Sequence, residues 1–277
     1  MSETTDTSRE LAAFLRTRRE RLTPRDIELP RGQRPRRTPG LRREEVAEMA
    51  NVSVDYVTRL EQGRGLRPSP EVLEALARAL QLSTDERAYL FDLAQRRQAS
   101  GRKPMPQTPP ESLTRLVRDL SPLPSMLLNH RLDILTWNPE MVALMLDFGA
   151  LPHEQRNALW LCLFHPALRD LYSDQASVVR DAVADLRAAW AAHPEDTELG
   201  ELIEELTLQS TEFARLWPMQ CVRVNGRGLR PLLHPQVGPL TVEYEILTPL
   251  QDADHRIIIY RAADPASQAA MDAIARS

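Results

Sequence analysis

The sequence predicts an α + α/β two-domain protein, with an all-α domain of five helices over residues 1–98 and an α+β domain over residues 113–277. Three observations predict this fold. Apolar residues recur at helical spacing through the first part. Short alternating segments fill residues 220–260, as in an antiparallel meander. Between the two parts, residues 99–112 hold four prolines and one glycine without periodicity, which is typical of a semi-rigid linker.

Local start signals place the five helices of the first domain. Ser8 can cap the first helix, and Ser69 precedes a proline, a residue favoured at the first helical position. Residues 83–86 form the capping box Ser-Thr-Asp-Glu. We expect helices over residues 8–21, 41–50 and 54–62, a fourth from residue 70 and a fifth from residue 84.

In the second domain the periodicity changes along the chain. Two strands joined by a tight turn around His130 and Arg131 come first, then several helices, then a run of short strands. This order is that of an α+β fold. The expected strands cover residues 125–129, 132–137, 220–224, 229–234, 240–247 and 256–260, and the expected helices cover residues 111–120, 139–147, 174–192 and 196–209, with a last one from about residue 267.

The composition excludes several classes of protein. With 42% hydrophobic and 27% charged residues, the chain has the balance of a globular protein and not of a disordered one. It contains no apolar run near the ~20 residues of a membrane helix, and its acidic, polar N-terminus is unlike a secretory signal. Cys162 and Cys221 show no metal or redox spacing. We therefore expect a soluble cytoplasmic protein without membrane association.

Charge is divided unevenly along the chain. Residues 1–100 contain 19 arginines and 16 acidic residues, a net charge of +3, whereas the remainder has 16 basic and 23 acidic residues, a net charge of −7. The basic excess is concentrated in residues 8–67. A basic segment in an acidic protein is typical of a nucleic-acid contact surface, because phosphate neutralisation supplies most non-specific affinity. A solvated charged face is the alternative that charge alone leaves open.

The main motif is a helix-turn-helix over residues 43–60. The side chain of Ala47 is a single methyl group, so a second helix can cross the first closely at that point. Asn51 falls at the turn, where a left-handed backbone is needed and asparagine is tolerated next best after glycine. Ser53 then caps the second helix, whose apolar residues pack back on the first. An ordinary helical hairpin is the alternative.

The outward side of the second helix is the expected base-reading surface. If Val57 and Leu60 point inward, the opposite side meets base edges in the major groove. Arg59 can donate to a guanine, and Asp55 can accept from a cytosine amine. Asp55 has the alternative of complementing the helix dipole. The residues expected to contact DNA from this helix are Ser53, Asp55, Tyr56, Thr58, Arg59 and Gln62.

Other arginines are candidates for phosphate contacts. Arg42 and Arg43 open the preceding helix, and Arg64 and Arg67 follow the recognition helix. The long loop before Gly40 carries arginines between prolines and can lie in a narrow minor groove; a solvated loop is the alternative. The loop arginines are Arg25, Arg31, Arg34, Arg36 and Arg37, of which Arg36 and Arg37 are the DNA-contact candidates.

These residues carry a family resemblance. Residues 40–63, which run from Gly-Leu-Arg-Arg-Glu-Glu through Val-Ser-Val-Asp-Tyr to Glu-Gln-Gly, resemble the XRE-type, Cro/repressor-like helix-turn-helix family. The preceding arginine/proline loop and the second domain resemble one branch of it, the MmyB-like transcriptional regulators. The C-terminal resemblance depends on residues 129–139, 216–217 and 234–245. Asn51 departs from the glycine that the wider family usually has at the turn.

The resemblance implies a PAS-like ligand-binding domain after the DNA-binding domain. It implies a small apolar, fatty-acid-like ligand held between a sheet and flanking helices. Two alternatives remain: the aromatic residues only fill the core, or the domain serves dimerisation alone. The candidate ligand-binding residues are Trp137, Phe164, Trp217 and Tyr244, with Asn138 and His234 as polar anchors.

The sequence shows no constellation of catalytic or metal-binding residues. Its six histidines form no pair at metal-ligand spacing, and the close pair Cys162 and His165 lacks an orienting third group. There is no glycine-rich phosphate-binding motif. We therefore expect no enzyme activity, no metal and no cofactor.

The sequence as a whole predicts a transcriptional regulator that binds double-stranded DNA. A homodimer on a pseudo-palindromic operator is expected, because two recognition helices about 34 Å apart meet half-sites one helical turn apart. The first alternative is a helix-turn-helix protein-interaction module, antitoxin-like or a scaffold. The second is an enzyme whose C-terminal domain converts its small molecule.

Overall fold

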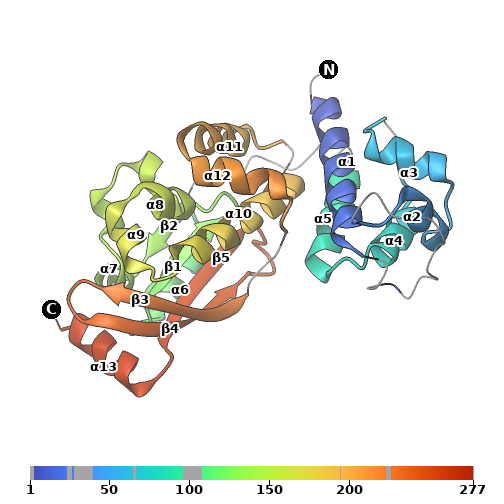
Figure 1. Ribbon diagram of the computed structural model, residues 1–277. Helices are drawn as coiled ribbons and strands as arrows, with labels where there is room; N and C mark the ends of the chain where they lie inside the picture. The colour runs from blue at the N-terminus through green and yellow to red at the C-terminus, as the bar shows by residue number, and fades with distance from the viewer. Residues whose placement is uncertain are drawn as a thin grey trace. The chain divides into compact units, whose positions relative to one another are not determined.

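The computed structural model describes residues 3–23, 27, 40–64, 67–95, 108–193, 195–222 and 226–276. The chain forms two compact units (Figure 1). Unit 1 contains Met1–Arg102 with the short segments Trp190–Thr197 and Pro218–Arg223, and unit 2 contains Lys103–Ala189, Glu198–Trp217 and Val224–Ser277. Most of the linker expected over residues 99–112 lies outside the described residues.

Five helices build the N-terminal part of unit 1, as the sequence predicts. They are α1 (Glu3–Arg21), α2 (Arg43–Met49), α3 (Val54–Glu61), α4 (Pro70–Ala79) and α5 (Thr84–Gln95). The expected cap at Ser8 is wrong, because α1 already begins at Glu3 and Ser8 lies inside the helix.

The other two predicted helix starts are confirmed by their hydrogen bonds. The Ser69 hydroxyl accepts from the amide of Val72 at 3.4 Å. At the capping box, the Ser83 amide donates to Glu86 Oε2 at 3.0 Å and the Glu86 amide donates to Ser83 Oγ at 3.2 Å. Two of the backbone N–H groups that lack a partner within the helix at the start of α5 are therefore satisfied by neighbours in sequence.

Unit 2 is built on one antiparallel sheet of five strands in the order β2-β1-β5-β4-β3. The predicted meander of the last three strands is confirmed, and β1 adds to its β5 edge. The strands are β1 (Ser125–Asn129), β2 (Ile134–Trp137), β3 (Arg227–His234), β4 (Gly238–Leu247) and β5 (His255–Ala262).

Helices cover both faces of the sheet (Figure 1). On one face, α6 (Glu111–Asp119) packs Leu113 and Val117 against Leu127 of β1 and two isoleucines of β5. On the opposite face, α10 (Gln175–Ala192) pairs Asp181 with Arg230 at 2.7 Å and Asp185 with Arg256 at 3.2 Å. The remaining helices are α7 (Pro139–Leu144), α8 (Ala158–Phe164), α9 (Pro166–Leu171), α11 (Thr197–Gln209), α12 (Thr211–Leu216) and α13 (Pro265–Ile274).

Several element boundaries differ from the sequence prediction. Residues 220–222 of the strand expected at 220–224 form no strand, because Gln220 takes a left-handed backbone with φ of 55°; residues 223 and 224 lie outside the described residues. Strand β2 starts at Ile134 and not at Leu132, whose φ is 69°. Helix α7 stops at Leu144, and Asp147 caps a separate 3₁₀ turn, Phe148–Ala150. The helices α8, α9 and α12 were not predicted.

A buried histidine lies at the start of β5. Neither ring nitrogen of His255 has a hydrogen-bond partner within the described part of the chain. Burial lowers the pKa of His255 below its usual value, the carboxylates of Asp252 and Asp254 oppose this shift, and His130 adds to it. The folded state therefore favours the neutral form of His255 over the charged form.

We expect the protein to lose stability as the pH falls below about 6.5, the usual histidine pKa. Below this pH the unfolded chain binds a proton at His255 more readily than the folded chain, whose His255 pKa is lowered. The stabilisation due to neutral His255 is therefore fully present above about 6.5 and decreases as the pH falls. Urea unfolding at pH values about one unit above and below it, followed by tryptophan fluorescence, measures the effect. His255→Gln should show a weaker pH dependence than the wild type, and equal pH dependence would rule out this role.

Within the described residues, none of the helices has the length and the apolar character needed to cross a membrane.

Candidate nucleic-acid interface and ligand site

The turn between α2 and α3 has the geometry that the sequence predicts. Asn51 has a φ of 52°, in the left-handed region. The amide of Val52 donates to the carbonyl of Ala47 at 3.0 Å, which closes the turn. Ala47 is buried, so its small side chain lies at the close approach of the two helices. The turn therefore forms with asparagine at its left-handed position.

Helix α3 has a buried side and an exposed side. Ser53 Oγ accepts from the amide of Tyr56 at 3.1 Å and caps the helix. Val57 and Leu60 are buried against the rest of unit 1. On the other side Asp55, Arg59 and Gln62 are exposed, the arrangement that the helical spacing predicts.

The residues that flank this exposed side differ in their contacts. Tyr56 is half-buried, and burial raises the pKa of its phenol. Thr58 is also half-buried and donates its hydroxyl to the Val54 carbonyl at 2.8 Å. Arg64 and Arg67, which follow α3, are exposed. The loop arginines Arg25, Arg31, Arg34, Arg36 and Arg37 lie outside the described residues.

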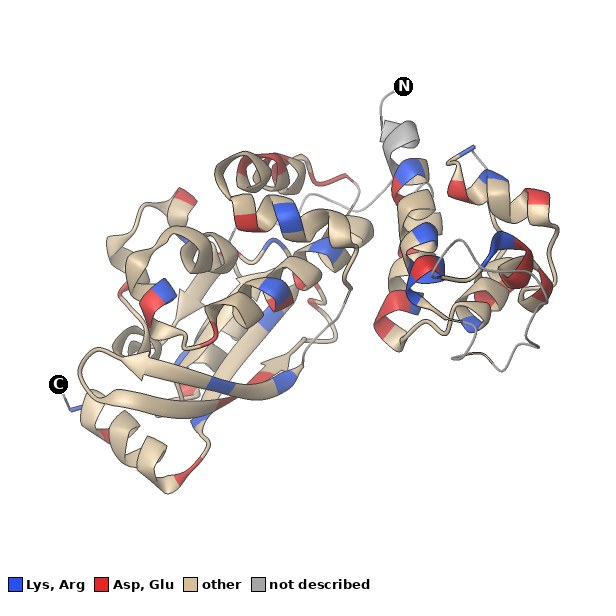
Figure 2. Cartoon of the chain, in the orientation of Figure 1, with Lys and Arg blue, Asp and Glu red and all other residues tan. Residues whose placement is uncertain are grey.

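Charge is mixed in the described part of this unit. Figure 2 shows basic and acidic positions close together at the start of α2 and along α3. A shallow hollow at the start of α2 is lined by Arg42 and Arg43 together with Arg19, Glu20, Gly40, Leu41 and Glu44. The backbone N–H of Arg42 donates to Glu45 Oε2 at 2.7 Å. The two candidate phosphate ligands Arg42 and Arg43 thus line the same hollow.

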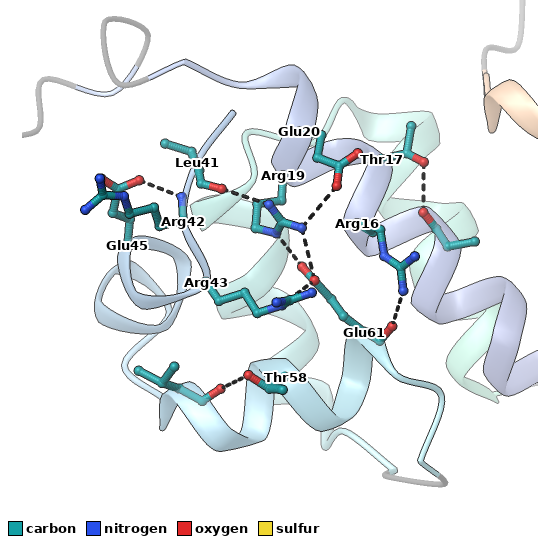
Figure 3. Close-up of polar contacts among 12 residues, drawn as sticks. Arg16, Thr17, Arg19, Glu20, Leu41, Arg42, Arg43, Glu45, Thr58 and Glu61 are labelled. Atoms are coloured by element: carbon teal, nitrogen blue, oxygen red, sulfur yellow. Dashed lines mark hydrogen bonds and ion pairs between the residues drawn. The ribbon is translucent and has the colours of Figure 1, made fainter. Parts of the chain in front are cut away.

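A buried ion cluster that sequence reasoning missed joins three helices of unit 1 (Figure 3). Glu61, at the end of α3, is only 2% exposed and pairs with Arg19 of α1 and Arg43 of α2. Burial opposes the charged form of Arg19, but the hydrogen bond and charge of Glu61 raise its pKa above the usual value. The available signal was the position of Arg19, four residues after Leu15 on the apolar side of α1.

In unit 2, two of the six predicted ligand-binding residues line an open pocket. Trp137 and Asn138 form part of its wall with Arg118, Pro139, Val142 and Asp147. The Trp137 ring packs edge-on against Phe148 with a centroid distance of 5.3 Å, and the Arg156 guanidinium lies 5.9 Å from it. The lining of the pocket therefore combines one aromatic ring and two other apolar residues with three polar side chains.

Asn138 has a structural task in addition to its place in the pocket wall. Its Oδ1 accepts from the amides of Ser125 at 2.9 Å and Met141 at 3.1 Å. Its Nδ2 donates to the Leu123 carbonyl at 2.8 Å. The buried amide thus fixes the start of α7 to the start of β1.

The other four predicted ligand residues do not line this pocket. Phe164 packs on Trp160. Trp217 stacks on Phe213, and the Arg187 guanidinium lies 4.0 Å from its ring. The His234 ring contacts the carbonyl of Ala143 through Nε2 at 3.1 Å, and Arg230 lies over the Tyr244 ring at 4.7 Å. Each of the four has its own packing partner, so the structure does not gather the six residues at one site.

Buried hydroxyl and thiol groups lie close to Arg230 on the α10 face of the sheet. Burial raises the pKa of Tyr260 and of Cys162 to about 12. Burial also raises the pKa of Tyr172, which is hydrogen-bonded to Tyr260. At neutral pH these groups are therefore protonated and uncharged. Among the described residues, no three histidine, cysteine or acidic side chains come together in a way that suits a metal ion.

Comparison with known families covers both units. Residues 109–274 match the model of the MmyB-like transcription regulator ligand binding domain. Residues 10–90 match a helix-turn-helix domain. No curated protein matches the chain. The first match spans more than half of the sequence.

Proposed function

Because the chain belongs to the MmyB-like transcription regulators, we propose that α3 reads an operator in duplex DNA while a small apolar ligand binds unit 2. A helix-turn-helix DNA-binding domain and a ligand-binding domain in one chain are the pattern of a ligand-responsive regulator. We also propose that the protein acts in the cytoplasm as a homodimer on a pseudo-palindromic site.

The observation that carries the DNA-binding proposal is the two-sided character of α3. Val57 and Leu60 anchor the helix in the core, which leaves Asp55, Arg59 and Gln62 at the surface. A recognition helix presents such a side to the major groove. Arg59 can bind guanine through two parallel hydrogen bonds, the commonest specific contact.

Phosphate contacts on either side of the recognition helix supply affinity without sequence preference. We assign these contacts to Arg42 at the start of α2 and to Arg64 and Arg67 after α3, which are all accessible on the same unit. We also assign phosphate contacts to Arg36 and Arg37, which precede α2 in the sequence. Each phosphate that these side chains neutralise adds about 0.9 to the slope of log affinity against log salt.

The DNA-binding proposal is tested with the full chain and two duplexes. One is of random sequence, and the other is an operator enriched by the wild-type chain from a random library. We expect binding to the random duplex to weaken steeply as salt rises, and the enriched operator to bind at least 10³-fold more tightly at physiological salt. Binding without enrichment, or enrichment without salt dependence, would contradict the proposal.

We propose that the ligand binds at the pocket beside Trp137, and that it is fatty-acid-like. Trp137, Pro139 and Val142 give the pocket an apolar wall, and Arg118, an exposed lining residue, offers a cation to a carboxylate. A ligand bound there contacts α7 and the edge strand β2.

A bound ligand regulates the proposed dimer by shifting the equilibrium between two conformations of it. It can do so only if it binds one conformation more tightly than the other.

Trp137→Ala is expected to weaken binding of a long-chain fatty acid by tenfold or more, because it removes the largest apolar surface of the pocket. Isothermal titration with wild-type and variant chains measures the difference. Trp217→Ala is the control, since Trp217 stacks on Phe213 and does not line the pocket. A larger loss in the Trp217 variant would place the ligand elsewhere.

A further inference from the structure

The last turn of α3 is held by three arginines from two other helices (Figure 3). Arg19 donates from Nε to Glu61 Oε1 at 2.6 Å and from Nη2 to Oε2 at 3.1 Å. Arg43 donates from Nε to the same Oε2 at 2.7 Å. The backbone carbonyl of Glu61 accepts from Arg16 Nη2 at 2.8 Å. Both the side chain and the backbone of Glu61 thus fix the end of the recognition helix.

The same cluster fixes the start of α2. Arg19 Nη1 donates to the Leu41 carbonyl at 2.9 Å, and the Leu41 amide donates to the Arg19 carbonyl at 3.1 Å. Gly40 lies directly on the end of α1, where a Cβ would come within 2.5 Å of the Cα of Glu20. Contacts with the end of α1 therefore fix the backbone at Gly40 and Leu41, just before Arg42. Glu61 connects this segment to α3 through Arg19.

Arg43 takes part in this cluster through its Nε atom. That atom donates to the carboxylate of Glu61, whose side chain is 2% exposed and whose negative charge offsets part of the positive charge of Arg43. To reach a phosphate with Nε, Arg43 would have to leave Glu61 with Arg19 alone in a site closed to water. A buried carboxylate that loses a partner is costly. The geometry therefore favours retention of the Arg43–Glu61 pair when DNA binds.

We propose that Glu61 and Arg43 are positioning residues for DNA recognition: they set α3 relative to α2, while the phosphate at this end is bound by Arg42 and not by Arg43. This inference rests on the proposed DNA-binding function. It assigns different roles to two adjacent arginines that sequence reasoning treats alike. Arg42 contributes affinity for any duplex, and Arg43 contributes the orientation that discrimination requires.

The experiment measures affinity against salt for the full chain on the random duplex and on the enriched operator. Arg42→Ala should lower the salt slope by about 0.9 and weaken both duplexes equally. Arg43→Ala should leave the slope unchanged and lower the operator-to-random affinity ratio about tenfold or more. Glu61→Gln should resemble Arg43→Ala. The control is Glu74→Gln, which breaks a surface ion pair with Arg87 in the same unit and should change neither quantity.

A neutral rescue variant separates positioning from charge. Arg43→Gln carries no positive charge, but its amide can still donate to Glu61, so it should recover part of the ratio lost in Arg43→Ala. If circular dichroism shows that Glu61→Gln does not fold, Arg43→Ala and Arg43→Gln still test the positioning role, because the Arg43 side chain is partly exposed.

The proposal is overturned if Arg43→Ala lowers the salt slope as much as Arg42→Ala with an unchanged affinity ratio, or if Arg43→Gln recovers nothing. In either case wild-type binding stays intact and the proposed function stands. A wild-type chain without salt-dependent DNA binding would overturn both.

Discussion

Glu61→Ala is expected to destabilise unit 1 by about 3–5 kcal/mol, the usual cost of removing one partner from a buried ion pair. The substitution leaves Arg19, whose side chain is 9% exposed, without the carboxylate that binds it through two hydrogen bonds. It also removes the only carboxylate in the described residues to which Arg43 is bonded. Urea unfolding followed by far-ultraviolet circular dichroism measures the loss.

The control for this prediction is Glu74→Ala. Glu74 pairs with Arg87 at 2.7 Å, but both side chains are substantially exposed. Such a surface pair contributes at most about 1 kcal/mol. If the two variants lose the same stability, the Arg19–Glu61–Arg43 cluster does not hold the helices as described.

Arg59→Ala is expected to weaken operator binding by about 10- to 100-fold, the loss that corresponds to one two-bond contact with a guanine. Binding to the random duplex should fall far less, because base contacts contribute little to it. Fluorescence anisotropy with both duplexes at one salt concentration gives the two affinities.

The matched control is Arg78→Ala, which removes the same charge from the exposed last turn of α4. It should weaken both duplexes alike and only slightly. A similar loss of operator affinity in both variants would show that Arg59 acts by charge alone.

Features set by residues close in sequence could be predicted. The capping box at Ser83 and Glu86 forms because its partners are three residues apart, and the left-handed turn at Asn51 follows from the properties of one residue. The buried and exposed sides of α3 follow from helical spacing in the same way. Local rules were therefore sufficient for the presence of the five helices, though not for the start of α1, and for the exposed side of α3.

Features set by contacts distant in sequence could not be predicted. The pairing of β1 with β5 joins segments more than a hundred residues apart. Glu61 is bound by Arg19 and Arg43, 42 and 18 residues away, and helical spacing indicates no such partners. Helix α8, Ala-Leu-Trp-Leu-Cys-Leu-Phe, is apolar on all sides, so it has no amphipathic period to recognise.

The ligand site was predicted less well for the same reason. Aromatic residues that fill a core and those that line a pocket have the same sequence signature. Trp137 lines the pocket because it ends the edge strand β2, whereas Tyr244 lies on the inner strand β4 beneath Arg230. The order of the strands in the sheet, which the sequence does not give, distinguishes the pocket residue Trp137 from the packed residue Tyr244.

The central claim is that the exposed side of α3 reads bases, and the most direct measurement compares the base preferences of two chains. Wild-type protein and Arg59→Ala each select duplexes from one random library, and the enriched sequences are aligned. We predict a pseudo-palindrome with half-sites about one helical turn apart for the wild type. The variant should enrich the same sequence but lose its preference at one base pair in each half-site. Identical preferences in both chains at every position would contradict the claim.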